Sequence, residues 1–301
     1  MSESEVIHLG NQTAFSAANL MDPFDYALAN DFDAFEWFPD KKAWGGWDET
    51  DLTTALRADI RKVAASRDMR LSVHARWTIN PLLPNAAALL RGEVDLAQEL
   101  GASVLVVHLY TEAGIAAYAK AILPVLEWVA SSGLKLAIEN TVATAPADFN
   151  ALFKELRQLN SAALPHGGMC LDIGHANLCA ATRNDYLEFV DQLQSHVPII
   201  HAHVHENWGD ADTHLPLFTG PAASSDAGVR GLIDRMKRRG FSGSVILEQW
   251  PQPPSLLNHA RDTFLRLWNG SPPSKSTPRQ VRKIPDRAAR RSRRSISKIS
   301  Q

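Results

Sequence analysis

The feature of this chain that most restricts its fold is a regular alternation of short apolar runs with longer segments of helical periodicity. The alternation continues from the N-terminus to about residue 268, so an all-α or all-β fold is excluded. Eight of the apolar runs have the length and the β-branched or aromatic content of buried strands. They cover residues 6–10, 32–38, 70–75, 103–109, 135–140, 169–174, 198–206 and 244–250.

Eight strand and helix units in about 270 residues predict an α/β protein with a (β/α)8 barrel, because this fold typically needs about 250 residues. The barrel is expected to form one domain over residues 1–270. The rival is a doubly wound parallel sheet, which usually has fewer strands and a glycine-rich phosphate turn after the first strand. Here the first strand continues into GNQTAFS, which has no GxGxxG pattern, so the barrel is favoured.

The charge distribution separates the C-terminal segment from the rest of the chain. Residues 271–301 contain 10 of the 31 Lys and Arg residues and one of the 33 acidic residues, so residues 1–270 carry a net charge of −11. The segment is rich in Pro, Ser and Arg, which predicts a disordered basic tail. Two interpretations stay open, an arm for nucleic acid or another polyanion and a solvated extension without a partner.

Several classes of protein are excluded by composition. No run approaches the roughly 18–20 apolar residues of a membrane span, and residues 1–10 lack the basic and apolar regions of a signal peptide. The two cysteines, Cys170 and Cys179, are too few for a disulfide framework. We therefore expect a cytoplasmic protein with no membrane partner.

Histidines and carboxylates stand at the ends of the last six predicted strands. In a barrel of this type the chemistry lies where the strands end, at the C-terminal mouth. Between residues 74 and 203 the successive groups are 34, 31, 33 and 31 residues apart, and each interval is about one strand and helix unit. The groups expected at the mouth are His74, His108, Glu139, Asp172, His203, His205 and Glu248, with Asp212 and His214 from the polar loop after the seventh strand.

Carboxylates and imidazoles that converge in one pocket are costly to bury unless a cation neutralises them. The cluster therefore predicts a divalent metal site, and its mixed nitrogen and oxygen donors favour Zn, Mn, Co or Fe over Ca. His201 lies deeper on the seventh strand, where a hydrogen-bonded core histidine is expected. His8 and Glu36 are ambiguous, because neither has a second group at a diagnostic spacing.

Four tryptophans follow predicted strand ends, namely Trp37, Trp77, Trp208 and Trp250. Two roles stay open for them. They could stack on the apolar face of a sugar, or they could fill the cores of loops.

The strand-end sequences resemble those of the xylose isomerase-like TIM barrels, which include sugar phosphate isomerases and epimerases and endonuclease IV. The matching segments are SVHA, VVHL, AIENT, LDIGHA, HVHEN with GDADTHLPLFTG, and ILEQW. The resemblance is strong over the last six strands and looser over the whole barrel.

The resemblance to the sugar isomerases and epimerases implies one divalent metal, Mn, Zn, Co or Mg, held by Glu139, Asp172, His203 and Glu248. It further implies that Glu139 and Glu248 flank the substrate as acid and base. The substrate would be a sugar, a sugar phosphate or a related polyol, interconverted by proton transfer through an enediolate. The residues expected to bind it are His175, His74, His108 and Trp250.

The alternative is an endonuclease IV-like phosphodiesterase that cleaves abasic DNA with three zinc ions. The nine metal-binding positions of that branch have chemically suitable counterparts here, which are His74, His108, Glu139, Asp172, His175, His203, Asp212, His214 and Glu248. Arg76 and Trp77 stand where the nuclease has a tyrosine, and the acidic body fits a DNA track poorly. Against the epimerases, Gly209 stands where ketose 3-epimerases have an arginine.

Two further functions fit the same ligands: a lyase acting on a sugar derivative, and a metal-binding or regulatory barrel without catalysis. The expected partner is a sugar-like small molecule. Nucleic acid is expected to bind only through the basic tail, and a homo-oligomer stays open.

Overall fold

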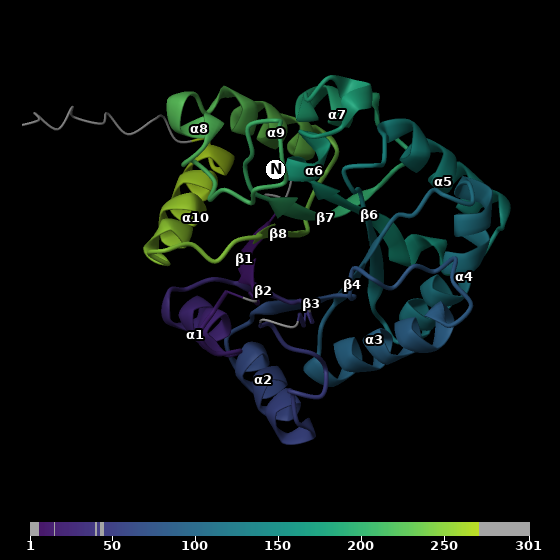
Figure 1. The fold of residues 1–301 in the computed structure, drawn as a ribbon, viewed down its shortest axis with the longest axis horizontal. Coiled ribbons are helices and arrows are strands. Elements are labelled where there is room, and N and C mark those ends of the chain that lie inside the picture. The colour runs from purple at the N-terminus through teal and green to yellow at the C-terminus, as the bar shows by residue number, and fades with distance from the viewer. Residues whose placement is uncertain (1–5, 15, 40, 43–44, 271–301) are drawn as a thin grey trace, which may run out of the picture.

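The eight strands form one closed parallel barrel in the computed structural model of the chain (Figure 1). The structure describes residues 6–14, 16–39, 41–42 and 45–270, so the predicted basic tail over 271–301 lies outside the described residues. Neighbouring strands in the sequence pair in parallel, and β1 closes the barrel against β8. The predicted (β/α)8 barrel is thus confirmed. The strands are β1 (His8–Gln12), β2 (Ala34–Trp37), β3 (Arg70–His74), β4 (Val104–His108), β5 (Lys135–Glu139), β6 (Gly167–Asp172), β7 (Ile199–Val204) and β8 (Ser244–Leu247).

The helices form a ring around the barrel (Figure 1). The α-helices are α1 (Asp22–Ala29), α2 (Thr54–Ser66), α3 (Ala86–Leu100), α4 (Ile115–Ser131), α5 (Pro146–Gln158), α6 (Ile173–Ala176), α7 (Tyr186–Gln192), α8 (Pro221–Ser224), α9 (Ala227–Arg238) and α10 (Ser255–Trp268). Short 3-10 helices, η1 (Leu164–His166) and η2 (Ala180–Thr182), flank β6 and α6. Within the described residues no helix is long and apolar enough to cross a membrane.

Strand alternation divides the barrel residues into two cores. On β5, Leu136 and Ile138 point outward into the large apolar core that the helices cover, whereas Ala137 lies in a small inner cluster. On β4, Val104 and Val106 belong to the same inner cluster. Because successive side chains alternate, the next inward position on β5 is Glu139, which lies at the mouth.

The strands begin or end one to three residues away from their predicted boundaries, and two of these differences affect the site. The first was expected over residues 6–10 but runs from His8 to Gln12, so Gln12 ends the strand at the mouth. The sixth was expected to reach residue 174 but ends at Asp172. There the Asp172 carboxylate accepts a hydrogen bond from the His175 backbone N–H and caps α6, which turns the chain away from the sheet.

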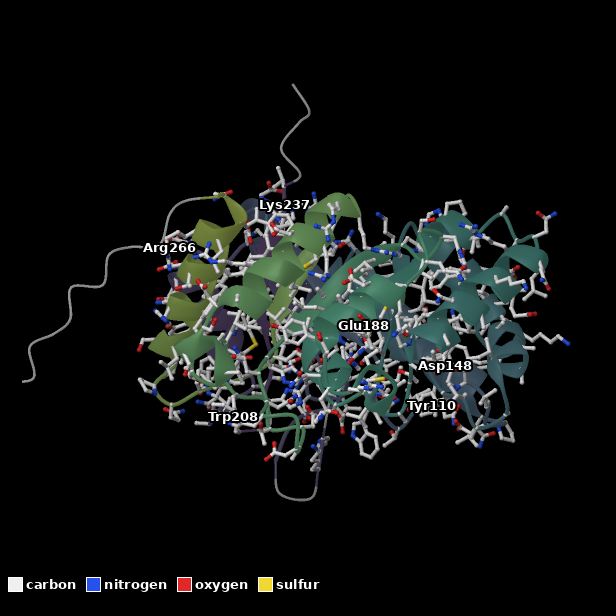
Figure 2. The ribbon with its side chains drawn as sticks, turned by 90° about the horizontal axis from the view of Figure 1, so that it is seen from above. Tyr110, Asp148, Glu188, Trp208, Lys237 and Arg266 are labelled. Carbon is white, nitrogen blue, oxygen red and sulfur yellow. The ribbon has the colours of Figure 1, made fainter. Side chains whose placement is uncertain are left out.

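Figure 2 separates the two ends of the barrel. Tyr110 and Trp208, which follow β4 and β7, lie along one edge of the molecule. Lys237, on the helix that leads into β8, lies at the opposite edge. The edge marked by Tyr110 and Trp208 is therefore the C-terminal mouth, where catalytic groups of this fold gather.

Close contact between β1 and β2 requires glycine at position 10. A Cβ atom at Gly10 would lie 2.3 Å from the Ala34 carbonyl oxygen, whereas a Cβ atom at Gly92, on α3, would meet nothing within 4 Å. We expect Gly10→Ala to lower the free energy of unfolding by about 1–3 kcal/mol through overpacking. Gly92→Ala is the control, and should raise it by about 0.5–1 kcal/mol because alanine favours the helix.

Urea unfolding followed by circular dichroism would measure both changes. Equal stability of Gly10→Ala and the wild type would contradict the tight β1–β2 contact.

Candidate metal centre

Four residues expected as metal ligands meet at the centre of the mouth. One donor atom from each of Glu139, Asp172, His203 and Glu248 lies within 4.8 Å of the others, and all four side chains are buried. The Nδ1 atom of His203 lies 3.2 Å from Glu248 Oε1 and 3.5 Å from Glu139 Oε1. The parallel register that pairs Asp172 with His203 brings their side chains to the same height.

A second group lies on the β3 and β4 side of Glu139. His74 Nε2 lies 2.7 Å and His108 Nε2 lies 3.3 Å from Glu139 Oε2. The other ring nitrogen of His74, Nδ1, lies 2.6 Å from the backbone oxygen of Ala75, and this second contact fixes the ring. One carboxylate therefore belongs to two adjoining groups of metal-ligating atoms.

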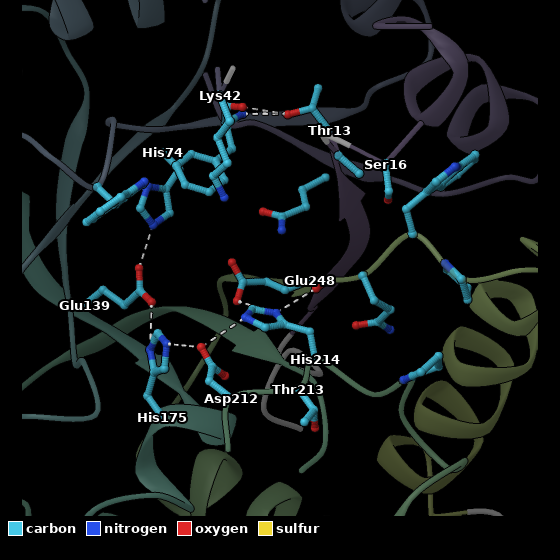
Figure 3. A pocket seen from close by; sticks show the side chains of 18 of the residues that line it. Thr13, Ser16, Lys42, His74, Glu139, His175, Asp212, Thr213, His214 and Glu248 are labelled. Carbon is cyan, nitrogen blue, oxygen red and sulfur yellow. Dashed lines mark hydrogen bonds and ion pairs between the residues drawn. The ribbon is translucent and has the colours of Figure 1, made fainter. Parts of the chain in front are cut away.

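A third group lies nearer the entrance and includes Asp212 and His214 from the loop after β7. Asp212 Oδ2 lies 3.3 Å from His175 Nε2 and 3.2 Å from His214 Nε2. Figure 3 shows the continuous chain of contacts that runs from His74 through Glu139, His175 and Asp212 to His214. All nine residues of the expected trinuclear set thus lie in one contiguous cluster, with donor groups that fit divalent cations.

His205 lies behind this cluster and is held by close packing. Its ring stacks on His214 with centroids 3.9 Å apart, and its Nε2 lies 3.2 Å from Asp172 Oδ1. A Cβ atom at Gly174 would lie 1.9 Å from the His205 ring, so only glycine leaves space for this imidazole. His205 can therefore approach the cluster only because Gly174, the second residue of α6, has no side chain.

Burial and neighbouring charges give Glu139 and Glu248 different pKa values. Burial raises the pKa of Glu139, but the imidazoles of His108, His203 and His74 outweigh it and hold this pKa well below its usual value. Burial raises the pKa of Glu248 to about 7, against the opposing effect of His203 and with support from the neighbouring carboxylates. Without a cation, Glu248 therefore keeps a proton far more readily than Glu139.

The environment of His203 Nδ1 also fits a bound metal at this centre. His203 Nδ1 is buried and has no hydrogen-bond partner among the described residues, although it faces the carboxylates of Glu139 and Glu248. An imidazole nitrogen and several carboxylates aimed at one point are stabilised by a divalent cation.

A cavity of about 570 Å³ opens directly above the cluster. One side presents the metal-ligating residues, and the other presents aromatic and amide side chains. The lining includes Gln12, Thr13, Phe38, Lys42, Trp47, His74, Trp77, His108, Glu139, His175, Asp212, His214, Glu248, Gln249 and Trp250. A cavity of this volume accommodates a single small molecule.

The tryptophans expected near the mouth separate into different environments. Trp77 and Trp250 line the cavity, as stacking on a ligand requires. Trp208 lines a different cavity of about 420 Å³. The stacking role is wrong for Trp37, because alternation along β2 turns it outward, where it packs fully buried against Phe24 and Phe35.

Sequence reasoning did not identify several cavity residues. Gln12 was missed because the first strand was placed two residues early, and the inward alternation from Gly10 would have found it. Gln249 follows Glu248 immediately beyond β8. Phe38 ends the predicted second strand, and the inward alternation through Glu36 would have found it. Trp47 comes from the segment between β2 and α2, which has no periodic signal, so only the tertiary structure shows its position.

Comparisons with known proteins identify the family. Residues 24–267 match the family described as "Xylose isomerase-like TIM barrel". The chain belongs to this family, which confirms the resemblance seen in the strand-end sequences.

An uncharacterized protein of Methanocaldococcus jannaschii is 26% identical over an alignment of 204 residues. The match covers 60% of this chain and 64% of that protein, which is less than two thirds of the relative. A D-tagatose 3-epimerase-like protein superposes with a TM-score of 0.68 at 21% identity, covering 88% of this chain and 99% of the other. Endonuclease IV from Thermus thermophilus superposes with a TM-score of 0.58 at 20% identity, covering 88% and 100%. At these identities the two structures show the same fold.

Metal binding should strengthen as the pH rises through neutrality. A ligand must lose its proton before it coordinates a metal, and the pKa of Glu248 is about 7. Below that pH the affinity should fall by up to about tenfold per pH unit for each competing proton. Calorimetric titration with Mn²⁺ at several pH values between about 5.5 and 8 would measure this slope. A Glu248→Gln variant should bind more weakly but with a shallower slope, and a pH-independent affinity of the wild type would contradict the assignment.

Proposed function

We propose that this protein is a divalent-metal-dependent isomerase or epimerase of a sugar, a sugar phosphate or a related polyol. The observation that carries the proposal is the convergence of Glu139, Asp172, His203 and Glu248 at the base of a cavity of about 570 Å³. The cavity is the size of a small-molecule site, and its polar groups are concentrated at one end. The structural likeness to a D-tagatose 3-epimerase-like protein agrees with this class of substrate.

The four central residues would hold the metal, which supplies positive charge that makes a neighbouring C–H group more acidic and stabilises an enediolate. Glu139 is the group that would remove the proton from carbon, since it lines the cavity and its carboxylate is already deprotonated at neutral pH. Glu248 reaches the same centre from the end of β8, three strands away around the barrel. Because a metal-bound Glu248 carries no proton of its own, the proton that Glu139 removes would return to carbon either from Glu139 itself or through Glu248 after exchange with water, and no other reactant is needed.

The walls of the cavity favour a polyhydroxylated ligand. Both amide atoms of Gln249 and the Oε1 atom of Gln12 are buried without a hydrogen-bond partner among the described residues, and both residues line the cavity. Amide groups both donate and accept hydrogen bonds, as hydroxyl groups do. Trp77 and Trp250 provide apolar surface of the kind that stacks on a sugar ring.

The proposal is tested by proton exchange. The metal-loaded protein is incubated with a panel of ketoses, aldoses and their phosphates in deuterated water, and incorporation at carbon is followed by NMR. Glu139→Gln should reduce exchange of an accepted sugar by about 10²–10⁴-fold, because it removes a general base. Glu188→Gln, an exposed change on α7, is the control and should retain full exchange. Full turnover by Glu139→Gln would contradict the acid and base assignment.

A second function, hydrolysis of abasic DNA with three metal ions, is favoured by a separate observation. The group of His74, His108 and Glu139 and the group of His175, Asp212 and His214 each bring three donors within 4.8 Å of one another, beside the central four. A single metal does not require either group. The structural likeness to endonuclease IV is in keeping with this candidate.

Metal content separates the two functions. Elemental mass spectrometry of the purified, unchelated protein should find about one Mn, Co, Zn or Mg per chain for the isomerase and about three Zn for the nuclease. His108→Ala should then leave most sugar exchange intact in the first case, because among the described residues the only ion pair of His108 is with one oxygen of Glu139, and His108 is not one of the four central ligands. In the second case it should abolish cleavage of an abasic oligonucleotide, because it removes a ligand.

A further inference from the structure

A buried carboxylate lies one layer below the candidate metal centre, inside the barrel. Glu36, on β2, has no exposed surface, and neither has His201 on β7. Glu36 Oε2 accepts a hydrogen bond from Ser72 Oγ at 2.8 Å and lies 2.9 Å from His201 Nε2. The second oxygen, Oε1, lies 3.0 Å from Nε2 of His203, which is one of the four central residues.

The fold alone gives no reason to bury this charge. The barrel interior also contains a buried cluster of apolar side chains, among them Val104, Val106 and Ala137. Replacing a buried ionic group by apolar residues of similar volume is often neutral or stabilising. Among the described residues, the only ion pairs of Glu36 are with His201 and His203, and neither is a permanent cation. The carboxylate is therefore best explained by what it does to these imidazoles.

We propose that Glu36 is a positioning residue that fixes the tautomer and the orientation of His203 for metal binding. The inference rests on the proposed metal centre but not on the reaction that the centre performs. His203 has two ring nitrogens with different neighbours: Nε2 faces Glu36, and Nδ1 faces Glu139 and Glu248. A proton held on Nε2 by the carboxylate leaves the lone pair of Nδ1 directed at the centre.

The contacts of the two carboxylate oxygens of Glu36 support these different roles of the two His203 ring nitrogens. Oε2 is already engaged by Ser72 and His201, so those two side chains hold Glu36 in place. Oε1 and His203 Nε2 lie 3.0 Å apart as an ion pair, and both atoms are buried and have no hydrogen-bond partner among the described residues. The Cys170 thiol also lies near the two imidazoles, but a thiol is a weak acceptor compared with a carboxylate. The charge of Glu36, one imidazole away from the centre, also favours a divalent cation there.

The test is the metal affinity of the full-length protein, measured by competition of Zn²⁺ and of Mn²⁺ with a chelator. Glu36→Gln keeps the shape of the side chain but removes the charge, and it should weaken binding by about 10–100-fold. Ser72→Ala is the matched control, because it removes one contact of Glu36 but leaves the His203 contact, and it should change the affinity by less than about threefold. Unchanged affinity in Glu36→Gln would overturn the proposal.

A second measurement does not depend on the variants folding. Long-range ¹H–¹⁵N NMR of the Zn²⁺-loaded wild type should show the single ring proton of His203 on Nε2, and a proton on Nδ1 would overturn the proposal. Thermal unfolding of the metal-free wild type and of metal-free Glu36→Gln distinguishes the proposed role from a purely structural one. In a purely structural role, Glu36→Gln would unfold at a lower temperature but would bind metal with the wild-type affinity once folded. If the wild type binds metal through this tautomer but exchanges no proton with any sugar, the proposed function fails and the role of Glu36 stands.

Discussion

The period of two along each strand is the constraint on which the rest of the structure depends. It sends Leu136 and Ile138 outward to the helices and Ala137 and Glu139 into the barrel, and the same division recurs on the neighbouring strands. Closure of β1 against β8 then leaves no strand edge and brings the last inward residues of all strands to one mouth. The site is a consequence of this geometry, since residues far apart in the chain reach equal heights.

Charged groups extend from the mouth of the barrel into its interior. The mouth contains the central carboxylates and imidazoles, and the interior contains Glu36 with His201 beside apolar side chains such as Val106 and Ala137. Burial of so many ionisable groups destabilises the free protein unless they pair with one another or with a cation. The structure pairs each carboxylate with at least one imidazole, and this arrangement explains why the pKa of Glu139 is low although the residue is buried. A divalent cation would replace protons in a network that is already assembled.

The cavity above this network joins two kinds of surface. The metal-ligating side is polar and rigid, because its residues are held by strands or by capped turns such as the one at Asp172. The opposite side, with Trp77, Trp250 and the amides of Gln12 and Gln249, comes from strand ends and loops. In barrels of this kind loop residues select the ligand while the strand ends perform the chemistry. The same cluster can therefore serve different substrates in different members of the family.

The sequence by itself determined the barrel, the number of its strands and the ring of His, Asp and Glu residues at its mouth, because hydrophobic periodicity and the spacing of strand and helix units are local properties of the chain. It also indicated that His74, Glu139 and Asp172 would share one height. Only the tertiary structure decided which neighbours each group has. It turns Trp37 outward, places Glu36 against His203 and brings Trp47 to the cavity. These contacts join distant strands and irregular loops, so they depend on barrel register and packing, which no local pattern records.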